Sequence, residues 1–234
     1  MAASTTIDNS HDAIVRKNTA ELSIYQHDYI VLSKLYEWLL EVAGTVACGV
    51  FLDYGCGGIP YRRTFEPYVS EYIAVDVAPA AGVILDMLIE PNKKLSLMDG
   101  TVDTILSSQV LEHVSDPCFY LKECFRLLRP TGKLIITVPM QWRLHEEPHD
   151  FHRFTKYGLV QILNSANLKV LDLRPAGGAF ALLGQVLSNT LSAKGFKNKL
   201  IFGLINKLFL WLDAKYPDYK DTLIWMCVAA PLKS

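Results

Sequence analysis

The sequence lacks any uninterrupted apolar stretch of about eighteen residues, the length that a helix needs to cross a bilayer. It also lacks an excess of charge, because 23 basic and 24 acidic residues leave a net charge of −1. Nucleic-acid binding normally leaves a basic footprint, so nucleic acid is not an expected partner. The segment Met1–Ser10 lacks the basic start and apolar run of a secretion signal. These absences predict a chain with neither a membrane span nor an export signal.

The five cysteines are odd in number and include no C-x-x-C pair. This spacing suits neither a disulfide framework nor a structural zinc site. We therefore expect free thiols, a cytoplasmic location and no bound metal.

Strand and helix patterns alternate along the chain. Runs rich in β-branched residues predict buried strands, and their continuity favours a parallel sheet covered on both faces; they occupy 49–54, 72–75, 83–85, 102–107 and 133–138. Helical spacing is found at 21–42, 60–65, 117–128 and 155–166, and further strands are expected at 169–173 and 222–229. Gly44 is expected to end the first helix, and Thr155 to cap the last. This order predicts an α/β fold with a doubly wound, Rossmann-like sheet.

The chain contains no internal repeat and no linker rich in Pro, Gly or Ser. We expect a flexible tail at 1–20, followed by a single domain over 21–234. An apolar stretch between the last two strands predicts a helical insertion at about 178–216.

A glycine-rich turn follows the first strand, at Gly55-Cys56-Gly57-Gly58. Such a turn, followed by a helix, places backbone amides and a positive helix end at the carboxyl edge of the sheet. A dinucleotide fingerprint, G-x-G-x-x-G, requires a third glycine where Pro60 stands, and the Gly-Lys-Ser/Thr of a phosphate-binding loop is absent. The turn therefore predicts a ligand other than a dinucleotide or a nucleoside triphosphate.

Three aspartates follow or end successive predicted strands: Asp53, Asp76 and Asp86. A carboxylate beside the glycine turn suits an ammonium group, one at the next strand end suits two ribose hydroxyls, and the third accepts from a purine amine. One such aspartate is ordinarily a solvated side chain, but ligands bind at this edge of the sheet. Together they predict a ligand with an amino-acid end, a ribose and an adenine.

Three stretches resemble the motifs of class I S-adenosylmethionine-dependent methyltransferases. They are Phe51-Leu52-Asp53-Tyr54-Gly55-Cys56-Gly57, Val102-Asp103-Thr104-Ile105-Leu106-Ser107-Ser108-Gln109-Val110-Leu111-Glu112-His113-Val114 and Glu123-Cys124-Phe125-Arg126-Leu127-Leu128-Arg129-Pro130-Thr131-Gly132-Lys133-Leu134. The resemblance runs from about Phe51 to Pro139 and implies a seven-stranded, mostly parallel sheet with an antiparallel last strand. The sequence departs from the pattern at Ile59, where many relatives carry a third glycine.

The same resemblance implies the S-adenosyl-L-methionine contacts. The methionine part would lie against Asp53, Gly55, Cys56 and Gly57, the ribose against Asp76 and Val77, and the adenine against Asp86 and Met87. The pocket floor would consist of Ser107, Ser108, Gln109 and His113, with His113 bracing the cofactor loop rather than reacting.

The segment 142–155 follows the fifth strand and is dense in histidine. It resembles the His-x-x-Pro-x-Asp-Phe-x-Arg-Phe-Thr stretch of a methyltransferase subgroup associated with glycans and secondary metabolites. One hypothesis is a metal site at His145, His149 and His152, which Pro148 disfavours because it interrupts a helix. Another is a structural loop in which Asp150 pairs with Arg153.

A third hypothesis assigns catalysis to this segment, with His145 or His149 as the general base. Histidine has a suitable pKa for deprotonating a hydroxyl, although alignment of the acceptor can suffice without a base.

The apolar segment 197–212 has two interpretations. A buried cap or homodimer face is the ordinary one. The other is a helix lying on a membrane surface, with the nearby lysines among lipid headgroups.

The predicted function is methyl transfer from S-adenosylmethionine to a hydroxyl of a sugar or secondary metabolite. The alternatives are a protein or lipid-linked acceptor, and an S-adenosylmethionine-binding protein without activity.

Overall fold

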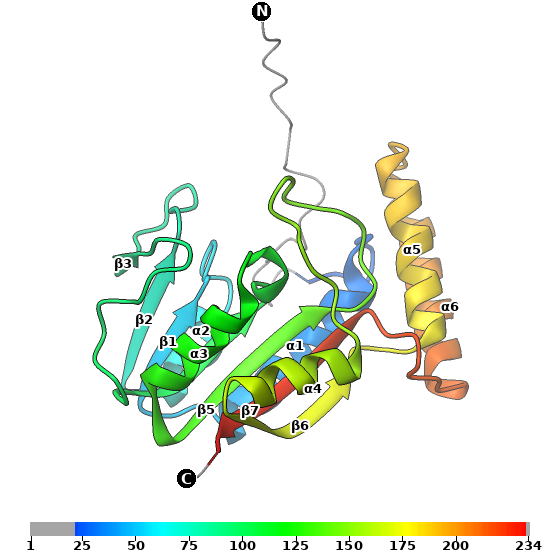
Figure 1. Ribbon diagram of the computed structural model, residues 1–234. Helices are drawn as coiled ribbons and strands as arrows, with labels where there is room; N and C mark the ends of the chain where they lie inside the picture. Colours follow the sequence, from blue (N-terminus) through cyan, green and yellow to red (C-terminus); the bar gives the residue numbers. More distant parts are fainter. Residues whose placement is uncertain (1–21, 233–234) are drawn as a thin grey trace, which may run out of the picture.

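The computed structural model describes residues 22–232, so the predicted tail at 1–20 lies outside the described residues. Seven strands form one sheet in the order β3-β2-β1-β4-β5-β7-β6 (Figure 1). Their bounds are β1 Val50–Tyr54, β2 Glu71–Asp76, β3 Met87–Leu88, β4 Val102–Ser108, β5 Leu128–Pro139, β6 Leu168–Pro175 and β7 Ile224–Pro231. The first five pair in parallel, and β7 runs antiparallel between β5 and β6. The expected doubly wound sheet with an antiparallel last strand is confirmed.

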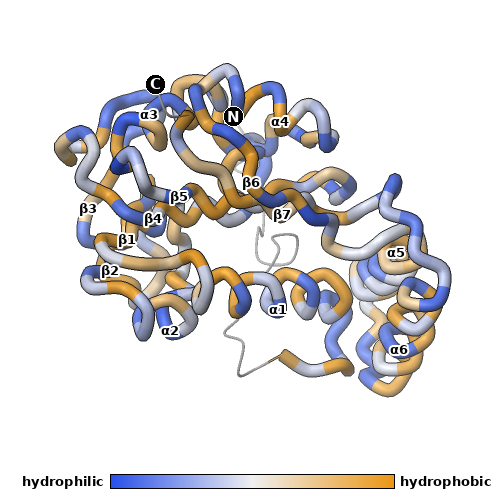
Figure 2. Tube along the Cα trace, turned by 90° about the horizontal axis from the view of Figure 1, so that it is seen from below, coloured by the Kyte–Doolittle hydropathy of each residue, from blue (hydrophilic) through white to orange (hydrophobic). Residues whose placement is uncertain are grey.

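Helices cover both faces of this sheet. Figure 2 shows α1 (Tyr29–Thr45) and α2 (Arg62–Phe65) on one face, and α3 (Pro117–Leu127) and α4 (Lys156–Ser165) on the other. The remaining helices are α5 (Ala179–Ala193), α6 (Lys199–Lys215) and the 3₁₀ turns η3 (Glu66–Tyr68) and η4 (Leu111–His113).

Alternate residues of the central strands supply two hydrophobic cores. Phe51 packs with the α1 side, whereas its neighbour Leu52 packs with the α3 side, and both are fully buried. Ile135 and Ile136 divide between the faces in the same way. Each such side chain stabilises the fold by about 1.5–3 kcal/mol, so a polar residue at any of these positions would be costly. This two-sided burial explains why the strands read as continuous apolar runs.

The N-terminal helix is shorter at its start than its apolar spacing predicts. It begins at Tyr29, not near residue 21, and it runs through Gly44, which therefore does not end it. Side chains of the C-terminal helices hold the preceding backbone: Asn206 Nδ2 donates to the Ile24 and Gln26 carbonyls, both at 2.7 Å. These tertiary hydrogen bonds replace the helical ones that local propensity favours.

Two short elements also differ from the prediction. The expected strand at 83–85 is irregular, and the strand lies instead at β3, where Met87 pairs with Val75. Ile84 is 89% exposed, so its β-branched side chain marks no buried position. The expected helix at 60–65 consists only of the single turn α2, so no long helix offers a positive end beside the glycine turn.

The helical insertion expected at about 178–216 is present as the antiparallel pair α5 and α6, which packs beside α1 (Figure 1). Asp213 of α6 is buried and accepts from the amides of Gly178 and Ala181 at 3.0 and 3.1 Å. The carboxylate therefore satisfies amides at the start of α5. Within residues 22–232, no helix is long and apolar enough to cross a membrane.

Candidate functional site

The glycine turn after β1 has a backbone that requires glycine at two positions. Gly55 has φ +85° and Gly57 has φ +53°, both in the left-handed region. A Cβ on Gly55 would lie 2.7 Å from both γ-carbons of Val110, which comes from the segment after β4. The turn and that segment therefore approach as closely as only a glycine permits.

Ile59, where the sequence departs from the methyltransferase pattern, also has a positive φ, +53°. A β-branched residue in this region costs about 1–2 kcal/mol. The chain thus keeps the backbone shape that a glycine adopts freely. Because Ile59 packs partly buried against the core, its apolar contacts offset some of that strain.

Asp76 ends β2 and is tied to the glycine turn. Its Oδ2 accepts from the amide of Gly57 at 2.6 Å, and its Oδ1 accepts from the amide of Val77 at 2.6 Å. The carboxylate is therefore oriented at the carboxyl edge of the sheet, with lone pairs left for hydroxyl donors. Val77 is 56% exposed beside it.

Asp53 is buried at the end of β1, with 2% of its surface exposed. Its Oδ2 accepts from the Tyr72 hydroxyl at 2.5 Å. Burial, followed by the charge of Asp53 and this hydrogen bond, raises the pKa of Tyr72 well above its usual range, so the phenol stays a donor. Asp53 is a fixed negative charge behind the turn rather than an open side chain. Cys56, 1% exposed, is likewise enclosed.

Asp86 does not end a strand, contrary to the expected pattern. It precedes β3 and accepts from the amide of Ala74 at 2.8 Å, while its own amide donates to the Ala74 carbonyl at 2.9 Å. Since Leu88 is the residue level with Asp76, Asp86 lies about two residues back from the strand ends. Its side chain extends the pairing of β2 toward Met87.

The end of β4 supplies buried polar side chains. The hydroxyl of Ser107 accepts from Tyr120 at 2.9 Å, and those of Ser108 and Thr137 lie 3.0 Å apart. Gln109 has φ +56°, and its side-chain amide donates to Thr137 at 3.0 Å. These contacts fix the polar side chains at the end of β4.

The loop after β5 is held by an ion pair, as the structural hypothesis predicts. Arg153 bonds both carboxylate oxygens of Asp150, at 2.6 and 2.7 Å, and also donates to the Trp142 and Arg143 carbonyls at 3.2 and 3.0 Å. Burial raises the pKa of Asp150, but the bonds from Arg153 and from the His145 amide outweigh it and hold that pKa below its usual range. Thr155 caps α4 by accepting from the Gly158 amide at 3.1 Å, as expected.

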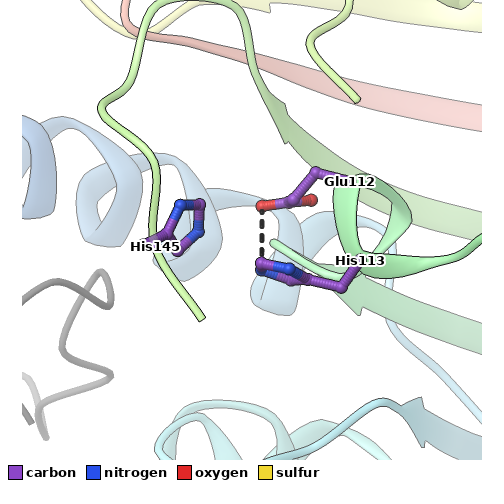
Figure 3. A group of neighbouring side chains, drawn as sticks. All are labelled: Glu112, His113 and His145. Carbon is purple, nitrogen blue, oxygen red and sulfur yellow. Dashed lines mark ion pairs between the residues drawn. The ribbon is translucent and has the colours of Figure 1, made fainter. Parts of the chain in front are cut away.

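His145 projects from this loop toward η4 (Figure 3). It is 2% exposed, and its ring lies edge-on to that of His113 with 4.7 Å between centroids. Burial, and then the His113 ring, lower the pKa of His145 below 6.5. Glu112, fully buried, lies beside both rings. His149 is exposed, and it joins the group only through its carbonyl, which lies 2.9 Å from His113 Nδ1.

A cavity of about 520 Å³ lies between the start of this loop and α5. Its lining combines apolar and hydrogen-bonding side chains, with Trp142, Leu182 and Val186 beside Gln141 and Asn189. This volume and this mixture suit a small organic molecule.

Several residues of this region were not predicted from the sequence. Glu112 and the tyrosines at 61, 72 and 120 were given no role. No local sequence pattern indicates that α5 forms a wall of the cavity, because the fold brings this distant segment beside the loop after β5.

Comparison with known proteins agrees with this geometry. A family model described as a methyltransferase domain matches residues 52–136. A ubiquinone biosynthesis O-methyltransferase of Xanthomonas euvesicatoria is 31% identical over 110 residues, which cover 42% of this chain and 44% of that protein. One from Cereibacter sphaeroides is 26% identical over 149 residues, covering 52% and 60%. The chain thus spans about half the length of these relatives.

Solved structures share the fold. The [4+2]-cyclase SpnF superposes with a TM-score of 0.58 and 20% identity, covering 86% of this chain and 80% of that one. The Burkholderia thailandensis 1,6-didemethyltoxoflavin-N1-methyltransferase, solved with S-adenosylhomocysteine, gives 0.55 and 17%, covering 84% and 76%. Residues 52–136 thus match a methyltransferase domain, and the chain shares the fold of these solved structures.

Proposed function

We propose that this protein transfers a methyl group from S-adenosylmethionine to a hydroxyl of a small-molecule acceptor. The observation that carries the proposal is the joined edge of β1 and β2, where the turn at Gly55–Gly57 and the carboxylate of Asp76 are hydrogen-bonded into one unit. The match to a methyltransferase domain covers this unit. The names of the matched relatives, which are O-methyltransferases, support a hydroxyl acceptor.

The residues of this edge suit the proposed cofactor in chemistry and shape. The surface at Val77 is exposed, and Asp76 offers acceptor oxygens for ribose hydroxyls. The buried charge of Asp53 favours a cationic group nearby. S-adenosylmethionine supplies an activated methyl group on a positive sulfur, so the protein mainly aligns the acceptor and excludes water.

The acceptor site in this proposal is the cavity between the loop after β5 and α5. Its polar side chains orient a hydroxyl-bearing molecule, and Trp142 with Val186 covers its apolar part. Sugars and aromatic secondary metabolites both combine such surfaces. A lipid-linked or protein acceptor is the alternative, with its reactive end in the same cavity.

Of the two predicted bases, the geometry favours His145 over His149. His145 is enclosed, and its ring is largely neutral at pH 7 because of its lowered pKa, whereas His149 faces solvent. A neutral imidazole is the form that accepts a proton.

The test is transfer of radiolabelled methyl from S-adenosylmethionine to a panel of phenols and sugars. Asp76→Ala is expected to lower cofactor affinity at least about tenfold, because each lost hydrogen bond to the charged carboxylate contributes about 1.5–3 kcal/mol. His145→Gln is expected to lower the rate about 10²-fold or more if it is the base. Cofactor binding without transfer to any acceptor would favour the non-catalytic alternative.

The second part of the proposal concerns α5 and α6, which present an unusual surface. Their buried positions are mostly small or polar, including Gly184, Gln185, Ser188, Gly203 and Asn206, and Phe202 is the large apolar exception. Seven of their large apolar side chains lie outside, between 40% and 69% exposed: Leu183, Val186, Leu187, Leu200, Leu204, Leu208 and Trp211. We call this set the leucine face. A soluble helix pair ordinarily has the reverse arrangement.

We propose that the leucine face rests on an anionic lipid surface. The lysines of this region are all exposed: Lys194, Lys197, Lys199, Lys207 and Lys215. The one acidic residue of α5 and α6, Asp213, is buried. Positive charge around an apolar face is the pattern of helices that lie at membrane interfaces. A second copy of the chain would offer the same positive charge and so repel.

We also propose that residues 21–234 form one domain, with the insertion at about 178–216. The five cysteines are free thiols, three of them buried, which supports the cytoplasmic location predicted from the sequence.

A further inference from the structure

His113, expected from the sequence to brace the cofactor loop, forms a cluster with Glu112 and His145. Figure 3 shows the first two side chains on η4 and the third on the loop after β5, facing them. One potential ligand atom from each residue lies within 4.8 Å of the other two. Two imidazole nitrogens and a carboxylate oxygen therefore converge from two separate segments.

The hydrogen bonds of the two rings leave one nitrogen of each available. His113 Nδ1 lies 2.9 Å from the His149 carbonyl, an acceptor, so Nδ1 carries the proton. His145 Nδ1 lies 3.2 Å from the Arg143 carbonyl and 3.2 Å from Asp150 Oδ2, again acceptors only. In the neutral rings, Nε2 therefore carries a lone pair. Histidine ligands of metal ions are held in this way, with the outer nitrogen bonded to a carbonyl or carboxylate.

The spacing within the cluster suits an ion better than direct bonds. His113 Nε2 lies 3.9 Å from Glu112 Oε1 and 3.7 Å from Glu146 Oε2, both beyond hydrogen-bond range. Ligands of one tetrahedral Zn²⁺, at bonds of about 2.1 Å, lie about 3.4 Å apart. Side-chain rotations that close the remaining gaps would bring the three atoms onto one ion, and Glu146 is near enough to become a fourth ligand.

We propose that Glu112, His113 and His145 form a binding site for a divalent transition-metal ion of the Zn²⁺ class. Two nitrogens and one oxygen suit Zn²⁺, Co²⁺ or Fe²⁺, whereas Mg²⁺ and Ca²⁺ prefer oxygen alone. Glu112 is fully buried and His145 is 2% exposed, so the ion would lie in an enclosed place. This site differs from the metal site considered from the sequence, which consisted of His145, His149 and His152. The carbonyl of His149 bonds the ring of His113, and neither the His149 ring nor His152 belongs to the cluster.

Such an ion would join η4 to the loop after β5. Those segments already share two backbone bonds, from the amides of Phe151 and His152 to the Glu112 carbonyl, at 2.8 and 3.1 Å. The ion would also use the Nε2 lone pair of His145, so this nitrogen cannot serve as a base while the ion is bound. Metal dependence of any methyl-transfer rate separates these two roles.

The test begins with the full-length protein stripped of metal by a chelator. Calorimetric titration with Zn²⁺ is expected to give one ion per chain, and Co²⁺ is expected to give the visible absorption of a nitrogen- and oxygen-ligated site. His113→Ala and Glu112→Gln should each weaken Zn²⁺ binding at least about tenfold. Loss of a residue that only supports a ligand already weakens metal binding by about that factor. His149→Ala is the matched control, because its exposed ring is not a ligand and its carbonyl remains.

The absence of stoichiometric Zn²⁺ binding by the unaltered protein would overturn the proposal. So would equal affinity in all three variants, or a Co²⁺ spectrum with thiolate bands, which would place the ion at exposed Cys48 or Cys118. Far-ultraviolet circular dichroism shows whether the variants fold. The Co²⁺ absorption spectrum of the unaltered protein tests the site even if a variant fails to fold. Titration of the metal-free protein with S-adenosylmethionine tests the proposed function separately, so the two can fail independently.

Discussion

At the scale of the residue, the candidate site rests on positions whose chemistry is visible in the sequence but whose partners are not. The dinucleotide fingerprint is excluded because Pro60 stands where its third glycine is required. The glycines at 55 and 57 have positive φ angles. The contact between Gly55 and Val110 joins segments far apart in the chain, so no local pattern predicts it. The burial of Asp53 against Tyr72 depends equally on strand pairing.

Gly55→Ala is expected to destabilise the protein by at least about 2 kcal/mol, because the left-handed backbone alone costs about 1–2 kcal/mol for a residue with a Cβ. The new Cβ would also lie 2.7 Å from Val110. Chemical denaturation measures the change. Gly58→Ala is the matched control, since no atom lies within 4 Å of its added Cβ, and its effect should stay within about 0.5 kcal/mol. Equal effects of the two variants would contradict the geometry of the turn.

At the scale of the element, the long periodic segments were predictable and the short ones were not. Strands β1, β2, β4 and β7 and the helices α3 and α4 lie close to their predicted ranges, because burial on the sheet imposes a clear pattern, whereas β5 begins at Leu128, well before its predicted start at 133. The strand expected at 83–85 was wrong because three β-branched or apolar residues do not establish burial. The start of α1 was wrong because side chains from α5 and α6 compete for its first turn.

One element-scale prediction concerns Arg126 of α3, which holds the segment leading to β4. Its guanidinium pairs with buried Glu123, and it donates to the Leu95 and Leu97 carbonyls at 3.2 and 2.9 Å. Its side chain is 15% exposed. Arg126→Ala is therefore expected to cost about 3–5 kcal/mol, as for other broken buried pairs.

Denaturant unfolding monitored by circular dichroism measures this cost. Arg129→Ala provides the comparison, because its side chain is 48% exposed and bonds Asp103 at the surface, where a pair contributes about 1 kcal/mol or less. If Arg126→Ala were no more costly than Arg129→Ala, the segment would not depend on this clamp.

At the scale of the whole molecule, the α/β sheet provides the edge on which the proposed cofactor and acceptor meet, and the insertion adds a second surface beyond it (Figure 2). Length, apolar content and element order predicted the sheet. They left open which side of α5 and α6 faces inward, because apolar residues occur on both sides of these helices. The polar partners of the inner side, Gln185 and Asn206, decide it by bonding the 24–31 backbone.

The leucine face is expected to bind vesicles containing anionic phospholipid in a co-sedimentation assay. Leu204→Glu with Leu208→Glu should weaken this binding at least about tenfold, because each leucine buried in lipid contributes about 1.5 kcal/mol or more. Leu171→Glu is the control, since this residue is 52% exposed on β6 rather than on the insertion. Self-association without vesicle binding would instead assign the face to a second copy.

Calorimetric titration of the purified protein with S-adenosylmethionine and with NAD shows whether the edge formed by the glycine turn and Asp76 holds S-adenosylmethionine. We expect saturable binding of S-adenosylmethionine, at least about tenfold weaker in Asp76→Ala because of the charged hydrogen bonds lost, and no binding of NAD. Binding of NAD, or unchanged S-adenosylmethionine affinity in Asp76→Ala, would contradict this expectation.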